Sequence, residues 1–339
     1  MPTAISPAAR YGSDAQYRLF DLLTAPLRWE VLAVALELGI FDDLTLPRAA
    51  GELAQQYGLD GEGTELLLNA LVSLGVVGKH EDSYCVDGGF APLLTSTSDI
   101  SMSNLLSYLG EVRHVSADNI IALLRDKQQV QTGPEMVRPE YWSRAVGGLR
   151  SFHRSVRNPI VMDILSGLPC WPGVKKMLDL GAGSESLALD ICAARPDIDT
   201  VIFDLPGVVA SLGSRVTDKT RIQLRGGDMN CDDLGTGYDL IWASMVFYYA
   251  RDLTSVMGRM RRALRPGGML ISFHEELNDD RTEPEFHILG RLHAELKSGP
   301  LSVARGRVRA AAAEAGFHNV QSFSLQTPFG QMELVTGTA

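Results

Sequence analysis

The sequence has few cysteines, no long apolar run and fewer basic than acidic residues, and each shortage excludes a class of protein. The four cysteines, Cys85, Cys170, Cys192 and Cys231, show no CxxC spacing, so we expect buried, reduced thiols rather than disulfides or a zinc site. No apolar run reaches the roughly 18–20 residues that span a bilayer. The first residues lack a basic stretch followed by an apolar one, so we expect a cytoplasmic chain without a signal peptide.

The deficit of basic residues bears on possible partners. The 339 residues include 41 Asp and Glu against 31 Lys and Arg, which gives a net charge of −10. Such a charge repels the phosphates of a nucleic acid. At about 100–200 residues per domain the length predicts two domains, and 45% apolar residues can form a core in each. We therefore expect a two-domain protein that binds neither nucleic acid nor membrane.

The first 125 residues have the spacing of helices. Apolar residues recur every three or four positions between Tyr17 and Leu38, and Gly39 follows where a helix would end. Two shorter helices and a polar hairpin come next, which is the order of elements in a winged helix. The expected helices cover residues 17–38, 49–57, 62–74, 103–125 and 140–165, with the hairpin over 76–86 and a loop over 126–139. The last helix would link the two domains.

After Lys175 the spacing changes to alternating strands and helices. Short β-branched segments alternate with stretches of helical spacing, which predicts a Rossmann-like, doubly wound α/β sheet. The expected strands cover residues 177–180, 200–204, 222–226, 239–243 and 269–273. The expected helices between them cover residues 187–194, 207–216 and 253–264. In the tail we expect a helix over residues 303–315 and a hairpin formed by residues 320–325 and 331–336. We therefore expect a helical winged-helix domain over residues 1–169 and an α/β domain over residues 170–339.

The sharpest local signal is a strand that runs into a glycine-rich turn before a helix. Gly181 and Gly183 lie in this turn, where small residues let the backbone approach a ligand. Asp204 ends the second strand 21 positions after Gly183 (204 − 183), close to the spacing of an acid that binds a ribose diol. Asp228 follows the third strand, where its carboxylate could accept from an adenine amino group. The residues therefore predict a nucleotide pocket.

Two details argue against a nicotinamide dinucleotide: Ser186 stands where the third glycine of GxGxxG would fall, and the loop holds no basic group for a pyrophosphate. The glycine turn and the acids that follow it instead resemble the class I S-adenosylmethionine-dependent methyltransferases. With the winged-helix half, the chain is similar to the small-molecule O-methyltransferase family of plant and antibiotic pathways over about residues 15–337. The resemblance implies an S-adenosylmethionine cofactor, a homodimer held by the N-terminal helices, and a small aromatic acceptor.

The resemblance also implies which residues hold the cofactor. The glycine turn would lie under its methionine part, the acid after the second strand would bind its ribose, and residues after the second and third strands would flank its adenine. The expected cofactor residues are Asp179, Gly181, Gly183, Glu185, Asp204, Leu205, Asp228, Met229 and Ser244.

One of these residues departs from the family pattern. The family usually has GxGxG, and here Glu185 stands at the third glycine. Its carboxylate could pair with the cofactor's ammonium, point to solvent from the first turn of the helix, or mark a lost cofactor site. We expect intact binding, because the acids for ribose and adenine are both present.

A second departure lies after the fourth strand of the α/β domain. The O-methyltransferases carry a general-base histidine there, and this chain has Tyr248. A tyrosine at this position, a histidine like His153 before the glycine turn, and a histidine like His293 before a Pro-x-Ser-Val segment resemble a narrower group, the bacteriochlorophyll C-20 carbon methyltransferases. The match implies a type of mechanism, and a porphyrinoid substrate does not follow from it.

Methylation of carbon fits these residues better than methylation of oxygen. The attacking carbon needs electron density from an ionised phenol, an enol or an aromatic nitrogen, and it loses a proton afterwards. Tyr248 could hydrogen-bond the activating oxygen while His153 or His293 takes the proton. Four aromatic residues are expected to line the acceptor pocket: Phe247, Tyr249, Trp142 and Phe152.

Metal binding is the other possible use of the histidines in the last third of the chain. His274, His287 and His293 lie near acidic residues, but no HxxxH motif is present, and His287 and His293 would fall on different faces of a helix. We expect a solvated acidic loop and no metal.

Three functions are compatible with these residues. The first is S-adenosylmethionine-dependent methyl transfer to a small aromatic or conjugated metabolite, with carbon favoured over oxygen. The second is an enzyme of the same fold that no longer transfers methyl, such as a pericyclase or lyase, which Glu185 and the missing histidine would explain. The third is DNA binding through the winged helix, but its recognition-like helix over residues 62–74 contains no lysine or arginine.

Overall fold

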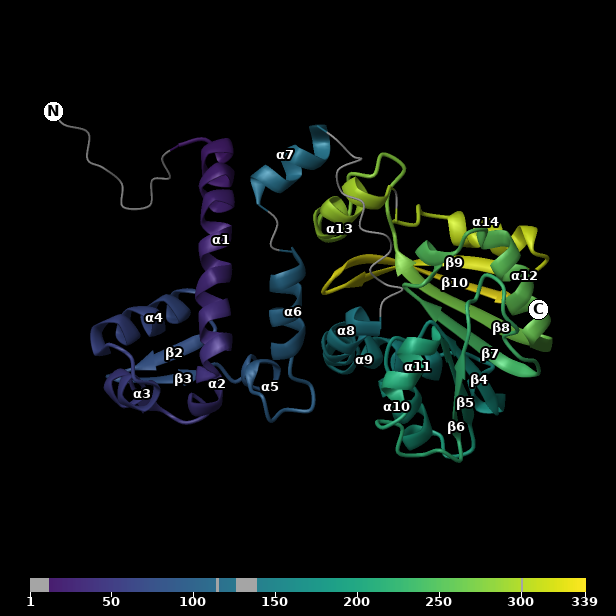
Figure 1. Cartoon of the computed structure of the whole chain (residues 1–339), viewed down its shortest axis with the longest axis horizontal. Helices are drawn as coiled ribbons and strands as arrows, with labels where there is room; N and C mark the ends of the chain where they lie inside the picture. The colour runs from purple at the N-terminus through teal and green to yellow at the C-terminus, as the bar shows by residue number, and fades with distance from the viewer. Residues whose placement is uncertain (1–11, 114–115, 126–138, 300) are drawn as a thin grey trace. The chain divides into compact units, whose positions relative to one another are not determined.

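The computed structural model describes residues 12–113, 116–125, 139–299 and 301–339, and the chain divides into two compact units between Ser107 and Tyr108 (Figure 1). The predicted α/β fold with a helical N-terminal domain is confirmed. No helix in the described ranges has both the length and the apolar character needed to cross a membrane.

The first unit contains the expected helices and hairpin. Helix α1 starts three residues before the predicted position, because Ser13 and Gln16 form a capping box, and it ends at Gly39 in the left-handed conformation. The helices are α1 (Asp14–Leu38), α2 (Ile40–Asp43), α3 (Ala50–Tyr57), α4 (Gly61–Ser73) and α5 (Ala91–Leu94). Strands β1 (Arg48–Ala49), β2 (Val77–His80) and β3 (Ser83–Val86) form an antiparallel sheet in the order β1-β3-β2.

The helices between the hairpin and the α/β sheet are more divided than predicted. Two helices, α6 (Ser103–Arg113) and α7 (Ala117–Arg125), lie within the range predicted as one helix. Residues 140–165 lie in α8 (Pro139–Phe152), a π-helical turn (His153–Arg157) and α9 (Asn158–Ser166). Most of the expected loop, residues 126–138, lies outside the described residues, and Pro139 begins α8.

The second unit is built on a sheet of seven strands in the order β6-β5-β4-β7-β8-β10-β9. The first five strands in this order are parallel, and β10 pairs antiparallel with both β8 and β9. The strands are β4 (Lys176–Leu180), β5 (Asp199–Asp204), β6 (Ile222–Gly226), β7 (Tyr238–Ser244), β8 (Leu264–Glu275), β9 (His318–Thr327) and β10 (Gly330–Thr338). All seven residues of β7 are buried, as expected of a central parallel strand with helices on both faces.

Helices cover both faces of this sheet (Figure 1). One face packs with α9 and α10 (Ser186–Ala194) and, towards β6, with α11 (Pro206–Leu212). The other packs with α12 (Leu253–Ala263) and α14 (Arg307–Glu314). Helix α13 (Glu285–Ser298) was not among the predicted elements, because charged residues and Gly290 interrupt its apolar spacing.

Candidate functional site

The glycine-rich turn lies at the carboxyl end of β4. At this strand the order of the sheet reverses, because the strands that follow β4 are added first on one side of it and then on the other. In the strand order, β5 lies on one side of β4 and β7 on the other, and ligands of doubly wound sheets bind at such a switch point. Gly181 and Gly183 have φ of 68° and 66°, which favour glycine. A Cβ on Gly181 would also lie 2.3 Å from Val246 Cγ2. The turn therefore needs glycine at Gly181 for two reasons.

Asp204, the predicted ribose acid, is tied to this turn. Its carboxylate accepts hydrogen bonds from the backbone N–H of Gly183 at 2.8 Å and of Leu205 at 2.7 Å. Burial raises the pKa of Asp204 to about 6 in spite of these two bonds. The structure thus brings together the turn and the acid that the sequence placed 21 positions apart.

The predicted adenine residues follow β6. Asp228 accepts from the backbone and side-chain N–H groups of Asn230, both at 2.8 Å, and Arg251 lies 3.5 Å from its carboxylate. Burial alone would raise the pKa of Asp228, but the Asn230 bonds and Arg251 outweigh it and the pKa is lowered. Met229 is buried beside it. Asp228 is therefore an ionised acceptor at neutral pH.

Three buried oxygens in or beside the glycine-rich turn have no hydrogen-bond partner in the described part of the chain. They are Oδ2 of Asp179, Oε2 of Glu185 and Oγ of Ser244. Because Leu180 pairs with Ala243 across β4 and β7, Ser244 lies opposite Gly181. Burial raises the pKa of Asp179 to about 7, although the nearby positive charge of Arg157 opposes this. Buried polar atoms are normally satisfied, so this edge has the character of a ligand site.

The π-helical turn packs on the glycine-rich turn. His153 is 5% exposed, and its Nδ1 lies 2.7 Å from Ser184 Oγ. Burial, with a smaller effect of Arg157, holds the pKa of His153 well below its usual value. π-Turns are rare and concentrate at functional sites. The structure places His153 at the predicted cofactor turn, and its predicted use as a proton acceptor stays a prediction.

Tyr248 lies on the short 3-10 helix Phe247–Tyr249 after β7, as expected for a residue at the end of that strand. The guanidinium of Arg291, from α13, lies 4.3 Å from the centre of its ring. Arg291 also forms an ion pair of 2.9 Å with the buried Glu275 and donates to the carbonyl of Leu301 at 3.2 Å. A positive charge therefore lies against the tyrosine ring, although no local pattern in the sequence marks Arg291.

His274 holds this short helix in place. Its Nε2 accepts from the backbone N–H groups of Val246 and Phe247, both at 3.0 Å, and its ring stacks on Phe247 with centroids 4.7 Å apart. Burial, with a smaller effect of Arg291, lowers the pKa of His274 to about 3. The imidazole is thus a neutral acceptor of two backbone hydrogen bonds, a role that differs from the metal binding considered for His274 and that no local pattern indicates.

The other histidines of this region lie on α13. His287 is buried, and His293 is half-buried. His293 comes two residues after Arg291 and is therefore rotated by about 200° from it around the helix. Within the described ranges, no group of three His, Cys, Asp or Glu side chains has an arrangement that could hold a metal ion.

The predicted acceptor aromatics are spread over several surroundings. Phe247 is buried in the core beside α12, while Tyr249 is 41% exposed and meets the Tyr248 ring edge to face at 4.7 Å. Phe152 packs edge to face on Phe329 at 5.1 Å. Trp142 lies in α8, but its side chain is outside the described part of the structure. Of the three described side chains, Phe247 and Tyr249 lie next to Tyr248 because they are its neighbours in the same short helix.

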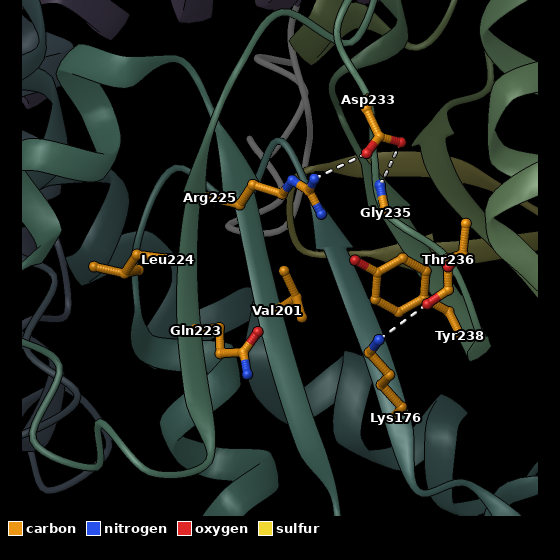
Figure 2. Close-up of a pocket in the computed structure, with 9 residues that line it drawn as sticks. All are labelled: Lys176, Val201, Gln223, Leu224, Arg225, Asp233, Gly235, Thr236 and Tyr238. Atoms are coloured by element: carbon orange, nitrogen blue, oxygen red, sulfur yellow. Dashed lines mark hydrogen bonds and ion pairs between the residues drawn. The ribbon is translucent and has the colours of Figure 1, made fainter.

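A pocket of about 500 Å³ lies elsewhere on the sheet (Figure 2). It includes Lys176 and Tyr238, the first residues of β4 and β7, so it reaches the amino ends of these strands. Lys176 donates to the Thr236 carbonyl at 2.9 Å, and Arg225 pairs with Asp233 at 2.9 Å. None of the predicted site residues lines this pocket.

Two family models match the chain. A model described as the O-methyltransferase domain matches residues 153–318, and one described as the O-methyltransferase dimerisation domain matches residues 16–124. Among the described residues, the two matches leave 12–15, 125, 139–152 and 319–339 uncovered.

Similar proteins include methyltransferases of two kinds. The 3-hydroxy-5-methyl-1-naphthoate 3-O-methyltransferase of Streptomyces sahachiroi is 26% identical over 78% of this chain and 79% of its own. The L-tyrosine C(3)-methyltransferase of Streptomyces lavendulae is 22% identical over 76% of this chain and 74% of its own. Among solved structures, human N-acetylserotonin methyltransferase in complex with SAM is similar in fold, with a TM-score of 0.79 over 97% of this chain and 99% of that one, at 21% identity.

Proposed function

The chain belongs to the O-methyltransferase family, and we propose that it transfers the methyl group of S-adenosylmethionine to a carbon atom of a small aromatic or conjugated metabolite. The observation that carries the choice of carbon is Tyr248, which replaces the histidine base of the family and lies against Arg291. The relatives named as a naphthoate O-methyltransferase and a tyrosine C-methyltransferase support an aromatic acceptor from secondary metabolism.

The residues at the carboxyl edge of the sheet fit the cofactor. Asp204 would hold the ribose hydroxyls, Asp228 and Met229 would flank the adenine, and the turn from Gly181 to Gly183 would lie under the methionine part. The unpartnered oxygens of Asp179 and Ser244 leave acceptors for this ligand. The bound cofactor supplies an electrophilic sulfonium methyl group, and the chain supplies alignment of that group with the acceptor.

On the acceptor side, Tyr248 and Arg291 can stabilise negative charge. A carbon nucleophile gains reactivity when a neighbouring oxygen is ionised, and a hydroxyl donor beside a guanidinium favours that ionised form. His274 fixes the backbone that carries Tyr248 without adding a second positive charge, because it is neutral. His293 and His153 remain the proposed acceptors of the proton that the methylated carbon releases.

A pericyclase- or lyase-like enzyme that keeps the cofactor as a fixed charge is the second candidate. Two observations favour it: the absence of the family's base at Tyr248, and the buried Glu185 at the third glycine of the turn. Such an enzyme would bind the cofactor and leave it unchanged.

The test uses methyl-labelled S-adenosylmethionine with two panels of acceptors. One panel holds phenols whose ring carbons ortho and para to the hydroxyl are all blocked, and the other holds phenols and β-dicarbonyls with a free nucleophilic carbon. We expect label only in the second panel, on carbon, and a loss of about 100-fold in kcat for Tyr248→Phe. Label on oxygen in the blocked phenols would overturn carbon methylation, and product formation without consumption of the cofactor would favour the second candidate.

A further inference from the structure

Glu185 is a buried carboxylate at the start of α10, directly after the glycine-rich turn. Its side chain is fully buried, and its Oε1 accepts from Nε of Arg150 at 2.5 Å. Its Oε2 is equally buried and has no hydrogen-bond partner among the described residues. A carboxylate oxygen in this state is costly, so a ligand group that donates a hydrogen bond would stabilise it.

Arg150 is the solvent-facing member of this pair. It lies near the end of α8, and 32% of its side chain is exposed. Of its nitrogens, only Nε has a hydrogen-bond partner within the described part of the chain, so the terminal nitrogens can bind an anion. A guanidinium presents several donors in a fixed fork that suits a carboxylate.

We propose that Glu185 and Arg150 together bind the zwitterionic amino-acid end of the donor, with the ammonium on Glu185 Oε2 and the carboxylate on the terminal nitrogens of Arg150. The proposal rests on the proposed function and adds to it a specific pair that selects the donor by its charged end. The ammonium of the ligand would then lie against the Glu185 carboxylate, and the carboxylate of the ligand against the Arg150 guanidinium. Each of the four charges would therefore have a neighbour of opposite sign.

The position of Glu185 directly after the glycine-rich turn distinguishes this pair from other buried ion pairs of the unit. The free energy needed to remove two charges from water is about as large as the free energy gained when they pair, unless hydrogen bonds also satisfy every remaining oxygen. Here one oxygen of the carboxylate is left over. Another buried acid, Glu276, accepts from Ser324 at 2.7 Å and pairs with Arg305 at 2.7 Å, both through Oε1. Its Oε2 is also buried without a hydrogen-bond partner in the described part of the chain, so Glu276 offers a matched control away from the glycine turn.

The test compares two ligands by isothermal titration calorimetry on the full chain. S-Adenosylhomocysteine has the amino-acid end, and 5′-methylthioadenosine has the same nucleoside without it. We expect Glu185→Gln and Arg150→Met each to weaken S-adenosylhomocysteine by about 10- to 100-fold, while the affinity for 5′-methylthioadenosine stays within about threefold. Glu276→Gln is expected to leave the ratio of the two affinities unchanged.

The outcomes separate this proposal from the proposed function. If S-adenosylhomocysteine does not bind the wild-type chain, the proposed function itself fails. If it binds, but Glu185→Gln and Arg150→Met keep the wild-type ratio of affinities, the proposed pair is overturned while the function stands. Binding of 5′-methylthioadenosine by each variant reports that its pocket is folded, and a variant that loses both ligands equally also counts against the pair.

Discussion

At the level of single residues, His274 shows how one buried side chain can determine the position of another. Its neutral imidazole accepts two backbone hydrogen bonds at the start of the turn that carries Tyr248, and Ser272 lies 3.0 Å from its other nitrogen. Because its pKa lies at about 3, the ring stays a neutral acceptor at neutral pH. The histidine is therefore a positioning residue for the backbone that carries Tyr248.

His274→Phe is expected to lower the free energy of unfolding by about 2–4 kcal/mol, because two buried N–H groups lose their acceptor while the stacking on Phe247 is kept. His274→Gln retains an acceptor oxygen and should lose less. Urea denaturation of both variants checks this. Equal losses of unfolding free energy in the two variants would show that the two backbone hydrogen bonds to His274 do not contribute to stability.

Asp204 makes the proposed donor affinity depend on pH. Its pKa of about 6 reflects burial, and ribose hydroxyls donate best to the ionised carboxylate. As the pH falls below about 6 the free protein binds a proton that must leave before the ligand binds, so the affinity for S-adenosylhomocysteine falls by up to about tenfold per pH unit. Calorimetry between about pH 5 and 8 measures this.

Two variants test whether Asp204 is the group whose protonation lowers the affinity for S-adenosylhomocysteine. Asp204→Asn should bind more weakly at pH 8 and lose the decline near pH 6. Asp228→Asn should also bind more weakly but keep the decline, because the pKa of Asp228 is lowered rather than raised. A decline that persists in Asp204→Asn would assign the titration to another group.

Among the elements, α1 has an apolar surface that its own unit does not cover. Leu19, Phe20, Leu22, Leu23 and Leu27 are each between 63% and 68% exposed. Large exposed apolar patches mark interaction sites, and these residues lie within the match to the dimerisation domain. A second copy of the chain is the expected cover for this face.

Combined Leu19→Glu and Leu23→Glu substitutions are therefore expected to convert a dimer into a monomer, because charges would have to be buried in the interface. Size-exclusion chromatography with light scattering measures the mass. Leu46→Glu, at a leucine that is 70% exposed outside α1, serves as the control and should leave the dimer intact. A monomeric wild-type chain at micromolar concentration would contradict the expectation.

At the scale of the whole molecule, the shortage of positive charge argues against DNA binding by the winged helix. Helix α4 corresponds to the recognition-like helix, contains no lysine or arginine, and belongs to a chain with a net charge of −10. Phosphate contacts supply most non-specific affinity for DNA. The unit therefore has the order of elements of a DNA reader without the charges that such a reader needs.

We expect no saturable binding of a labelled DNA duplex at protein concentrations up to about 10 μM in roughly 50 mM salt, where electrostatic attraction is strong. Fluorescence anisotropy measures this, with a basic winged-helix protein as the positive control. A salt-dependent Kd below about 10 μM would contradict the prediction.

Local patterns were enough to predict most of the elements and the proximity of Asp204 to the glycine-rich turn. Strand and helix periods, the glycine turn and the 21-position spacing of Asp204 are set by backbone geometry along the chain. The division of residues 140–165 by a π-turn was not predictable, because it depends on how His153 packs on Ser184. Helix α13 was missed because much of its stability comes from tertiary contacts rather than from its own periodicity.

The sequence by itself determined the family resemblance, the α/β order and the replacement of a histidine by Tyr248. Only the tertiary structure decided the partners of these residues: Arg150 for Glu185, Arg291 for Tyr248, and His274 for the backbone after β7. The physical reason is that these pairs form between separate elements, at separations such as 35 and 28 positions. No local spacing encodes such contacts, since they arise when helices pack on the sheet and exclude water from the charges between them.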